Sequence, residues 1–123
     1  MKKILLIDDD RDFNESLMEY LEYEGFDVAC AFDGKEGLSL VHQEKTDLII
    51  TDIVMPEADG IEFLRTLMDD SQTPSTKIIA MSGGGRIGGG RYLELAKAFG
   101  ADHVFDKPLD VEAFMKAINK LLD

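Results

Sequence analysis

Two patterns of apolar and polar residues alternate along this chain: short continuous apolar runs, and longer segments in which apolar residues recur every three or four positions. The short runs predict buried strands, and the longer segments predict amphipathic helices. We predict strands at residues 3–7, 26–31, 47–51, 77–81 and 102–105. A helical segment follows each strand, and this order is typical of a parallel sheet. The predicted fold class is therefore α/β, with a five-stranded sheet covered by five helices on both faces.

Each predicted helix carries an apolar stripe, which we interpret as the side that faces the core. In chain order the stripes consist of Phe13, Leu17, Met18 and Leu21; Leu38 and Val41; Ile61, Leu64, Leu67 and Met68; Leu93, Leu95, Ala96 and Phe99; and Val111, Phe114, Met115, Ile118, Leu121 and Leu122. Glycines at positions 25, 34 and 100 mark junctions between the predicted elements.

Length and charge restrict the possible functions. With 123 residues, the chain is expected to form one domain over residues 1–123. Its net charge of -12 would repel a nucleic-acid backbone, so we expect no direct nucleic-acid binding. No apolar stretch approaches the roughly 20 residues of a membrane span, and the start of the chain does not resemble a secretory signal. Together with the single cysteine, Cys30, these features favour a cytoplasmic protein that does not bind membranes.

Charged residues follow three of the predicted strands. Asp8-Asp9-Asp10 follows the first strand, Asp52 the third, and Lys107 the fifth. The carboxyl ends of parallel strands form one edge of a sheet, where ligands of such folds bind. Crowded carboxylates resist ionisation unless a cation lies among them. The sequence therefore predicts a site for a metal ion and a phosphate group.

The residue types suggest how such a site works. Asp9 and Asp52 could supply carboxylate oxygens to Mg²⁺, and Asp8 could hold a metal-bound water. An ionised Asp52 could then act as a carboxylate nucleophile. Ser82, directly after the predicted fourth strand, offers a hydroxyl group to a phosphoryl oxygen, and Lys107 offers a mobile positive charge. In-line positioning and charge neutralisation are the main requirements of phosphoryl transfer.

These residues resemble the receiver domain of bacterial two-component response regulators. The resemblance rests on four motifs in order, which span essentially the whole chain. They are Ile7-Asp8-Asp9-Asp10, Thr51-Asp52-Ile53-Val54-Met55-Pro56 with Asp59-Gly60, Ala80-Met81-Ser82-Gly83, and Asp106-Lys107-Pro108. Each motif alone is a weak signal, but together they are specific.

The resemblance implies a function and a set of roles. Asp52 would be phosphorylated by a histidine kinase or phosphotransfer protein, and Asp8, Asp9 and the backbone carbonyl of Val54 would organise Mg²⁺. Ser82 and Lys107 would contact the phosphoryl group. The domain would be a switch and not a turnover enzyme, and it would bind its target protein through the fourth helix, the fifth strand and the fifth helix.

The resemblance also implies structure. The strand order would be 2-1-3-4-5, as in flavodoxin-like folds. The Lys107-Pro108 peptide bond would be cis. Of the three aspartates in the first motif, we expect Asp10 to begin the first helix and to take no part in the metal site.

The chain departs from the family pattern in two places. Many receivers carry an aromatic switch residue three positions before the lysine, where this chain has Val104, with Phe105 next to it. The segment from Gly83 to Gly90 holds six glycines in eight residues. Because glycines lose much conformational freedom on ordering, we hypothesise that phosphorylation orders residues 83–91 and reshapes the output face.

Three other functions remain as alternatives. The Asp8-Asp9-Asp10 motif has the D-x-D spacing of haloacid-dehalogenase phosphatases, with Asp8 as nucleophile and Asp10 as acid. A weak G-x-G-x-x-G match at Gly83, Gly85 and Gly88 would suit a nucleotide phosphate. A receiver-like module could also bind a partner without being phosphorylated.

Overall fold

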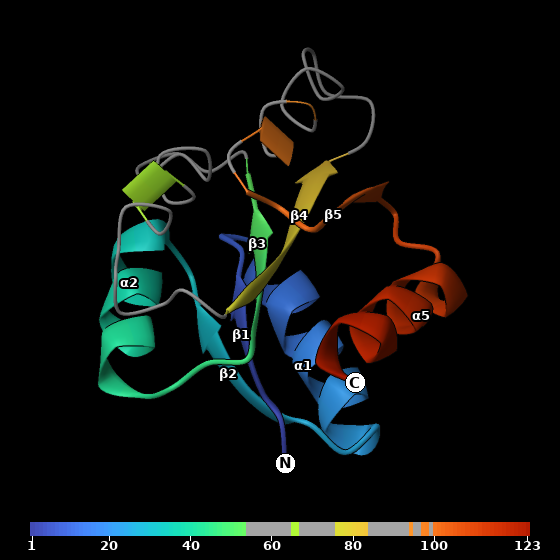
Figure 1. Ribbon diagram of the computed structural model, residues 1–123, viewed down its shortest axis with the longest axis horizontal. Coiled ribbons are helices and arrows are strands. Elements are labelled where there is room, and N and C mark those ends of the chain that lie inside the picture. The colour runs from blue at the N-terminus through green and yellow to red at the C-terminus, as the bar shows by residue number, and fades with distance from the viewer. Residues whose placement is uncertain (54–64, 67–75, 84–93, 95–96, 99) are drawn as a thin grey trace.

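A computed structural model describes residues 1–53, 65–66, 76–83, 94, 97–98 and 100–123 (Figure 1). Its elements, in chain order, are β1 (Lys3–Ile7), α1 (Arg11–Tyr23), β2 (Asp27–Ala31), α2 (Gly34–Gln43), β3 (Leu48–Asp52), β4 (Lys77–Gly83), β5 (His103–Lys107) and α5 (Val111–Leu122). The predicted third and fourth helices and the glycine segment after Gly83 lie almost wholly outside the described residues. Among the helices of the described part, none is long and apolar enough to cross a membrane.

The five strands form one parallel sheet in the order β2-β1-β3-β4-β5. Both the α/β class and the order implied by the family resemblance are confirmed. β1 lies between β2 and β3, with Ile7 opposite Ala31 on one side and Thr51 on the other. Three strands run further than predicted, so that Asp52, Ser82 and Lys107 belong to β3, β4 and β5. These three residues therefore occupy fixed positions in the sheet.

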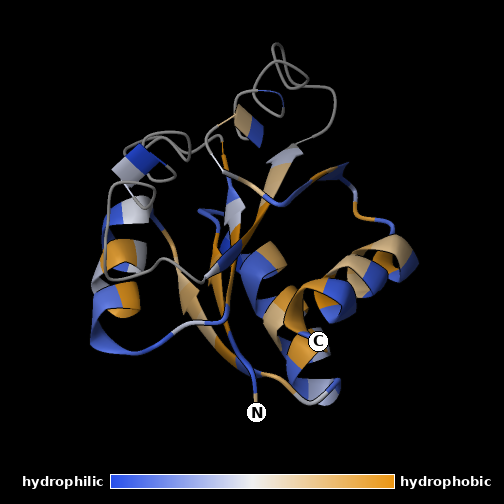
Figure 2. Ribbon diagram, viewed as in Figure 1, coloured by the Kyte–Doolittle hydropathy of each residue, from blue (hydrophilic) through white to orange (hydrophobic). Residues whose placement is uncertain are grey.

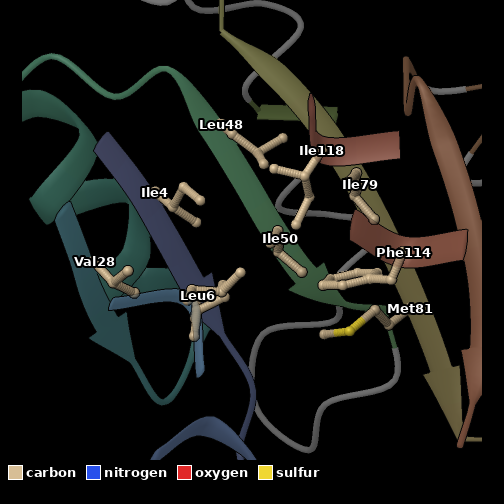
Figure 3. Packing of buried hydrophobic residues seen from close by; sticks show 10 residues of the cluster. Ile4, Leu6, Val28, Leu48, Ile50, Ile79, Met81, Phe114 and Ile118 are labelled. Carbon is tan, nitrogen blue, oxygen red and sulfur yellow. The ribbon is translucent and has the colours of Figure 1, made fainter. Parts of the chain in front are cut away.

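Helices cover both faces of the sheet: α2 lies on one face, and α1 and α5 lie on the other (Figure 1). Successive strand residues point to opposite faces. On the α2 side the buried cluster includes Leu5, Ile7, Val41, Ile49 and Ala80. On the other side it includes Ile4, Leu6, Ile50, Phe114 and Ile118 (Figure 3). Burial of both faces explains why the three inner strands, β1, β3 and β4, contain continuous apolar runs.

The hydropathy of the helices follows the same arrangement. Figure 2 shows hydrophobic residues along the strands and on parts of the helices, and hydrophilic residues on much of the outer helix surface. Phe114 and Ile118 of α5 reach over the sheet toward Ile50 and Met81 (Figure 3). The apolar stripe predicted for the first helix is therefore confirmed as core-facing, as is the stripe predicted for the last helix from Phe114 onward. The prediction was wrong for Val111, which lies in the first turn of α5 and is exposed.

Aspartates begin all three helices given bounds above. The side chains of Asp10, Asp33 and Asp110 accept hydrogen bonds from backbone N–H groups in the first turns of α1, α2 and α5. Such N-caps satisfy donors that have no partner within the helix. The prediction that Asp10 begins the first helix is confirmed. After α1, Gly25 adopts a positive φ of 99°, which favours glycine.

Candidate functional site

Three charged side chains, located at the ends of β1, β3 and β5, meet at the carboxyl edge of the sheet. The Nζ atom of Lys107 lies 2.5 Å from Oδ2 of Asp8 and 3.4 Å from Oδ2 of Asp52. The parallel order of β1, β3, β4 and β5 brings these residues together although they are far apart in sequence. The predicted convergence of these strand-end charges is confirmed.

Asp8 is held by backbone groups on both sides. Its N–H donates to the carbonyl of Ala31 at 3.2 Å, and its Oδ1 accepts from the N–H of Asp10 at 2.9 Å. The residue is fully buried. Burial raises the pKa of Asp8, and the hydrogen bond from Lys107 offsets this effect only in part. A further positive charge near Asp8 would favour its ionised form.

Asp8, Asp9 and Asp52 form an acidic cluster with the geometry for binding a cation. One carboxylate oxygen from each residue lies within 4.8 Å of the other two. Asp8 and Asp52 are buried, whereas Asp9 is exposed, so the cluster has a side open to solvent. Oxygen ligands of this kind suit Mg²⁺, which usually retains several water molecules. The residues present therefore fit the ion. Val54, the expected carbonyl ligand, lies outside the described residues.

Ser82 brings a buried hydroxyl group to the same end of the sheet. It lies in β4, one residue beyond Met81, which is the partner of Asp52 in β3. Its Oγ is fully enclosed and has no hydrogen-bond partner among the described residues. Buried hydroxyl groups nearly always have a partner, so an unpaired one is unusual. The Ser82 hydroxyl can therefore donate to an acceptor that enters the site.

Lys107 ends β5, and its ammonium group is held on more than one side. The Lys107-Pro108 peptide bond is cis, as the family resemblance implied. Besides its two carboxylate partners, Nζ lies 4.1 Å from the centre of the Phe13 ring. An aromatic face attracts a cation at this distance. The sequence indicated that Phe13 is a core residue but gave no sign of its contact with Lys107.

The aromatic residue next to the expected switch position faces away from α2. Phe105 packs edge-on against Phe114 of α5, with ring centres 5.3 Å apart. Val104, at the switch position itself, packs against the cluster on the α2 side of the sheet. Phe105 therefore does not take the place of the missing aromatic residue at position 104.

Asp10 and Gly83 belong to the motifs on which two of the alternative functions rest. The side chain of Asp10 is exposed and accepts from Phe13 N–H at 3.1 Å, so this carboxylate serves as a helix cap. Of the glycine motif, Gly83 lies within β4, while Gly85 and Gly88 lie outside the described residues. The site built from described residues is thus the one around Asp8, Asp9, Asp52, Ser82 and Lys107.

Known proteins resemble the chain in sequence. The family model for the response regulator receiver domain matches residues 4–119. The transcriptional regulatory protein CpxR of Escherichia coli K12 is 38% identical over 122 residues, which cover 99% of this chain and 50% of CpxR. The chain spans about half the length of the curated relatives it matches.

Solved structures resemble the chain in fold. The chemotaxis response regulator CheY4 of Vibrio cholerae superposes with a TM-score of 0.85 at 29% identity, covering 99% of both chains. A response regulator of Burkholderia pseudomallei, described as holding a phosphorylated aspartic acid, a calcium ion and citrate, gives a TM-score of 0.82 at 30% identity. That match covers 95% of this chain and 66% of the other.

Proposed function

The chain belongs to the family of response regulator receiver domains, and we propose that Asp52 is the residue at which it accepts a phosphoryl group. The observation that carries this proposal is the contact of Lys107 with both Asp52 and Asp8, beside an acidic cluster fit for a divalent cation. The phosphorylated aspartic acid of the Burkholderia relative supports the same chemistry. The proposed unit is a single receiver domain over residues 1–123.

In the proposed reaction, a carboxylate oxygen of Asp52 attacks the phosphorus atom of a phosphohistidine. A P–O bond to Asp52 forms as the P–N bond breaks, and the leaving imidazole takes a proton from solvent. Lys107 offers its positive charge to the phosphoryl oxygens, and Ser82 offers a hydroxyl proton to one of them. Both residues lie at the carboxyl edge of the sheet, in β4 and β5.

The acidic cluster would hold the metal ion. Asp8, Asp9 and Asp52 are the proposed ligands, directly or through water. Bound Mg²⁺ would neutralise carboxylate charge and the negative charge of the phosphoryl oxygens. The raised pKa of Asp8 supports this assignment, because an added cation favours the ionised carboxylate.

The proposed role is a signalling switch and not a turnover enzyme. Its donor would be a histidine kinase or phosphotransfer protein in the cytoplasm, as the family implies. Its output would be a protein bound at the face made by the fourth helix, β5 and α5. The net charge of -12 argues against direct binding of this domain to nucleic acid.

The family match argues against the phosphatase alternative. A haloacid-dehalogenase phosphatase would use Asp8 as nucleophile and Asp10 as acid, but Asp8 is buried against Lys107 and Asp10 caps α1. The family model matched over residues 4–119 is that of the receiver domain. We therefore propose no phosphatase activity.

The test uses acetyl phosphate as a small donor and the increase in intact mass as the readout. The wild-type protein should gain one phosphoryl group in the presence of Mg²⁺ and none after chelation. Asp52→Asn should gain none, whereas Asp106→Asn, which changes an exposed aspartate of β5, should label like wild type. Equal labelling of Asp52→Asn and wild type would refute the proposal. If neither the wild-type protein nor any variant takes up a phosphoryl group, the alternative of a module that binds its partner without phosphorylation would be favoured.

A further inference from the structure

Asn14 is a polar residue at a position where the helix pattern calls for an apolar one. It lies on α1, one helical turn before Leu17 and Met18 and two turns before Leu21. Asn14 and Leu21 are the buried residues of this helix, and Asn14 is fully enclosed. A buried carboxamide is unfavourable unless it makes hydrogen bonds, so its partners explain its presence.

The side chain of Asn14 bridges the ends of two strands. Its Nδ2 group donates to the backbone carbonyl of Asp8 at 3.1 Å and to that of Ala31 at 3.0 Å. The carbonyl of Ala31 also accepts from the N–H of Asp8 at 3.2 Å. The last residue pair of β1 and β2 is Ile7 with Ala31. Asn14 thus extends the tie between these strands by one residue beyond the end of the sheet.

This tie acts on the acidic cluster through a peptide plane. The carbonyl of Asp8 belongs to the peptide bond that joins Asp8 to Asp9. Because a peptide unit is planar, holding its oxygen also fixes the direction of the Asp9 N–H and of both neighbouring Cα atoms. The carboxylates of Asp8 and Asp9 leave from those Cα atoms. Asn14 can therefore set their relative orientation without contacting a bound ion.

The oxygen atom of the Asn14 carboxamide indicates that the two hydrogen bonds from Nδ2 are what this residue contributes. Its Oδ1 atom is buried with no hydrogen-bond partner among the described residues. Reversing the amide would place Oδ1 against two carbonyl oxygens, so the donor orientation is the favourable one. A leucine here would fill the stripe without an unpaired oxygen. Asn14 thus has an unfavourable unpaired oxygen, and the two hydrogen bonds from Nδ2 to the strand ends compensate for it.

We propose that Asn14 is a positioning residue for the metal and phosphoryl site. It holds the Asp8-Asp9 peptide so that the two carboxylates converge with Asp52 on one cation. This inference rests on the proposed function of the site. Groups that orient metal ligands without contacting the metal typically change metal affinity about 10- to 100-fold when they are lost.

The test compares Mg²⁺ affinity with stability in three variants. Asn14→Leu removes both donors at similar size, and Asn14→Ser removes them with less crowding. Thr46→Val is the matched control, because Thr46 is also a buried polar residue that donates to a carbonyl, but it precedes β3 at the opposite edge of the sheet. Calorimetry measures Mg²⁺ affinity at a temperature where circular dichroism shows each variant to be folded.

We expect either Asn14 variant that folds to bind Mg²⁺ about tenfold or more weakly than wild type. Thr46→Val should keep wild-type affinity even if its unfolding free energy falls. A folded Asn14→Leu or Asn14→Ser protein with wild-type affinity would overturn the inference. A loss of Mg²⁺ affinity in folded protein indicates a positioning role, whereas a loss of unfolding free energy alone indicates a merely structural role.

A second readout needs no metal. The N–H of Asp10 donates to Oδ1 of Asp8, so its hydrogen exchange reports on the position of the Asp8 side chain. Exchange at Asp10 should accelerate by about tenfold in the Asn14 variants and not in Thr46→Val. Unchanged exchange would contradict the inference. If wild type binds no Mg²⁺ and takes no label, the proposed function fails, while this readout still decides the role of Asn14.

Discussion

The ammonium group of Lys107 lies 2.5 Å from Oδ2 of Asp8, although the two residues are 99 positions apart in sequence. The same ammonium group is 3.4 Å from Asp52, so its closer carboxylate partner is Asp8. The lysine therefore lies against two members of the acidic cluster that would hold the metal ion. Phosphorylation of Asp52 would draw Lys107 from Asp8 toward the new phosphoryl oxygens.

Replacing Lys107 should have opposite effects on metal binding and on phosphorylation. Lys107→Met removes a competing cation, so Mg²⁺ affinity should rise by about tenfold. Labelling by acetyl phosphate should slow by about 100-fold, because the phosphoryl oxygens lose a positive partner. Lys116→Met, at an exposed lysine of α5, makes the same change in charge and should alter neither quantity. Calorimetry and intact mass measure the two effects; weaker Mg²⁺ binding by Lys107→Met would contradict the competition.

Without metal, Asp8 should make stability depend on pH. Burial raises the pKa of Asp8, so the folded protein keeps a proton that the unfolded chain loses near pH 3.8. Between pH 3.8 and the higher pKa of Asp8 in the folded state, the folded protein binds more protons than the unfolded chain. In this pH range Asp8 therefore makes the unfolding free energy fall as the pH rises. Above the pKa of Asp8 in the folded state, this residue is ionised in both states, and its contribution to the unfolding free energy no longer changes with pH.

Asp8→Asn should remove this dependence. Its unfolding free energy, relative to wild type, should increase as the pH rises from about 3.8 in urea titrations with chelator present. Glu19→Gln, at an exposed carboxylate of α1, is the control and should run parallel to wild type. An Asp8→Asn curve parallel to wild type would show that burial does not shift this carboxyl.

Removing the Ser82 hydroxyl should leave the unmodified protein stable. Because Oγ has no partner among the described residues, Ser82→Ala should lower the unfolding free energy by less than about 1 kcal/mol, or should increase it. Thr51→Val is the contrast, since the Thr51 hydroxyl donates to the Asp52 carbonyl at 2.9 Å; it should lose about 1 kcal/mol. Urea unfolding measures both, and a larger loss in Ser82→Ala would indicate that the hydroxyl is already bonded.

The ring of Phe13 should stabilise the Lys107 ammonium group. A double-mutant cycle with Phe13→Leu and Lys107→Met should give a coupling free energy of about 0.5–1 kcal/mol in urea unfolding. Phe13→Tyr keeps the aromatic face and should retain most of this coupling. Strict additivity of the two substitutions would show that the 4.1 Å contact does not stabilise the protein.

The fold was predictable because both faces of the sheet are covered. Strand residues that alternate between two buried clusters appear in sequence as continuous apolar runs such as Ile4-Leu5-Leu6-Ile7. In a parallel sheet, Asp8, Asp52 and Lys107 then lie at one edge, because each stands at the carboxyl end of its strand. Strand ends were less predictable, since Ser82 and Lys107 are polar residues whose strand pairing comes from neighbouring backbone.

The supporting residues were not predictable in the same way. Phe13 and Asn14 lie on or beside the apolar stripe of α1, and periodicity indicates burial without indicating which atoms are neighbours. The partners of Asn14 are main-chain carbonyls, which leave no signal in the identity of the residues that carry them. Phe13 meets a lysine from the far end of the chain.

The site of covalent modification tests the central claim most directly. The protein is treated with acetyl phosphate and Mg²⁺ and then with borohydride, which reduces an aspartyl phosphate to homoserine, and the peptides are mapped by mass spectrometry. We predict homoserine in place of Asp52 and nowhere else, and none when a chelator is present. Homoserine in place of Asp8, or an unmodified Asp52 in protein that has gained a phosphoryl group, would contradict the account.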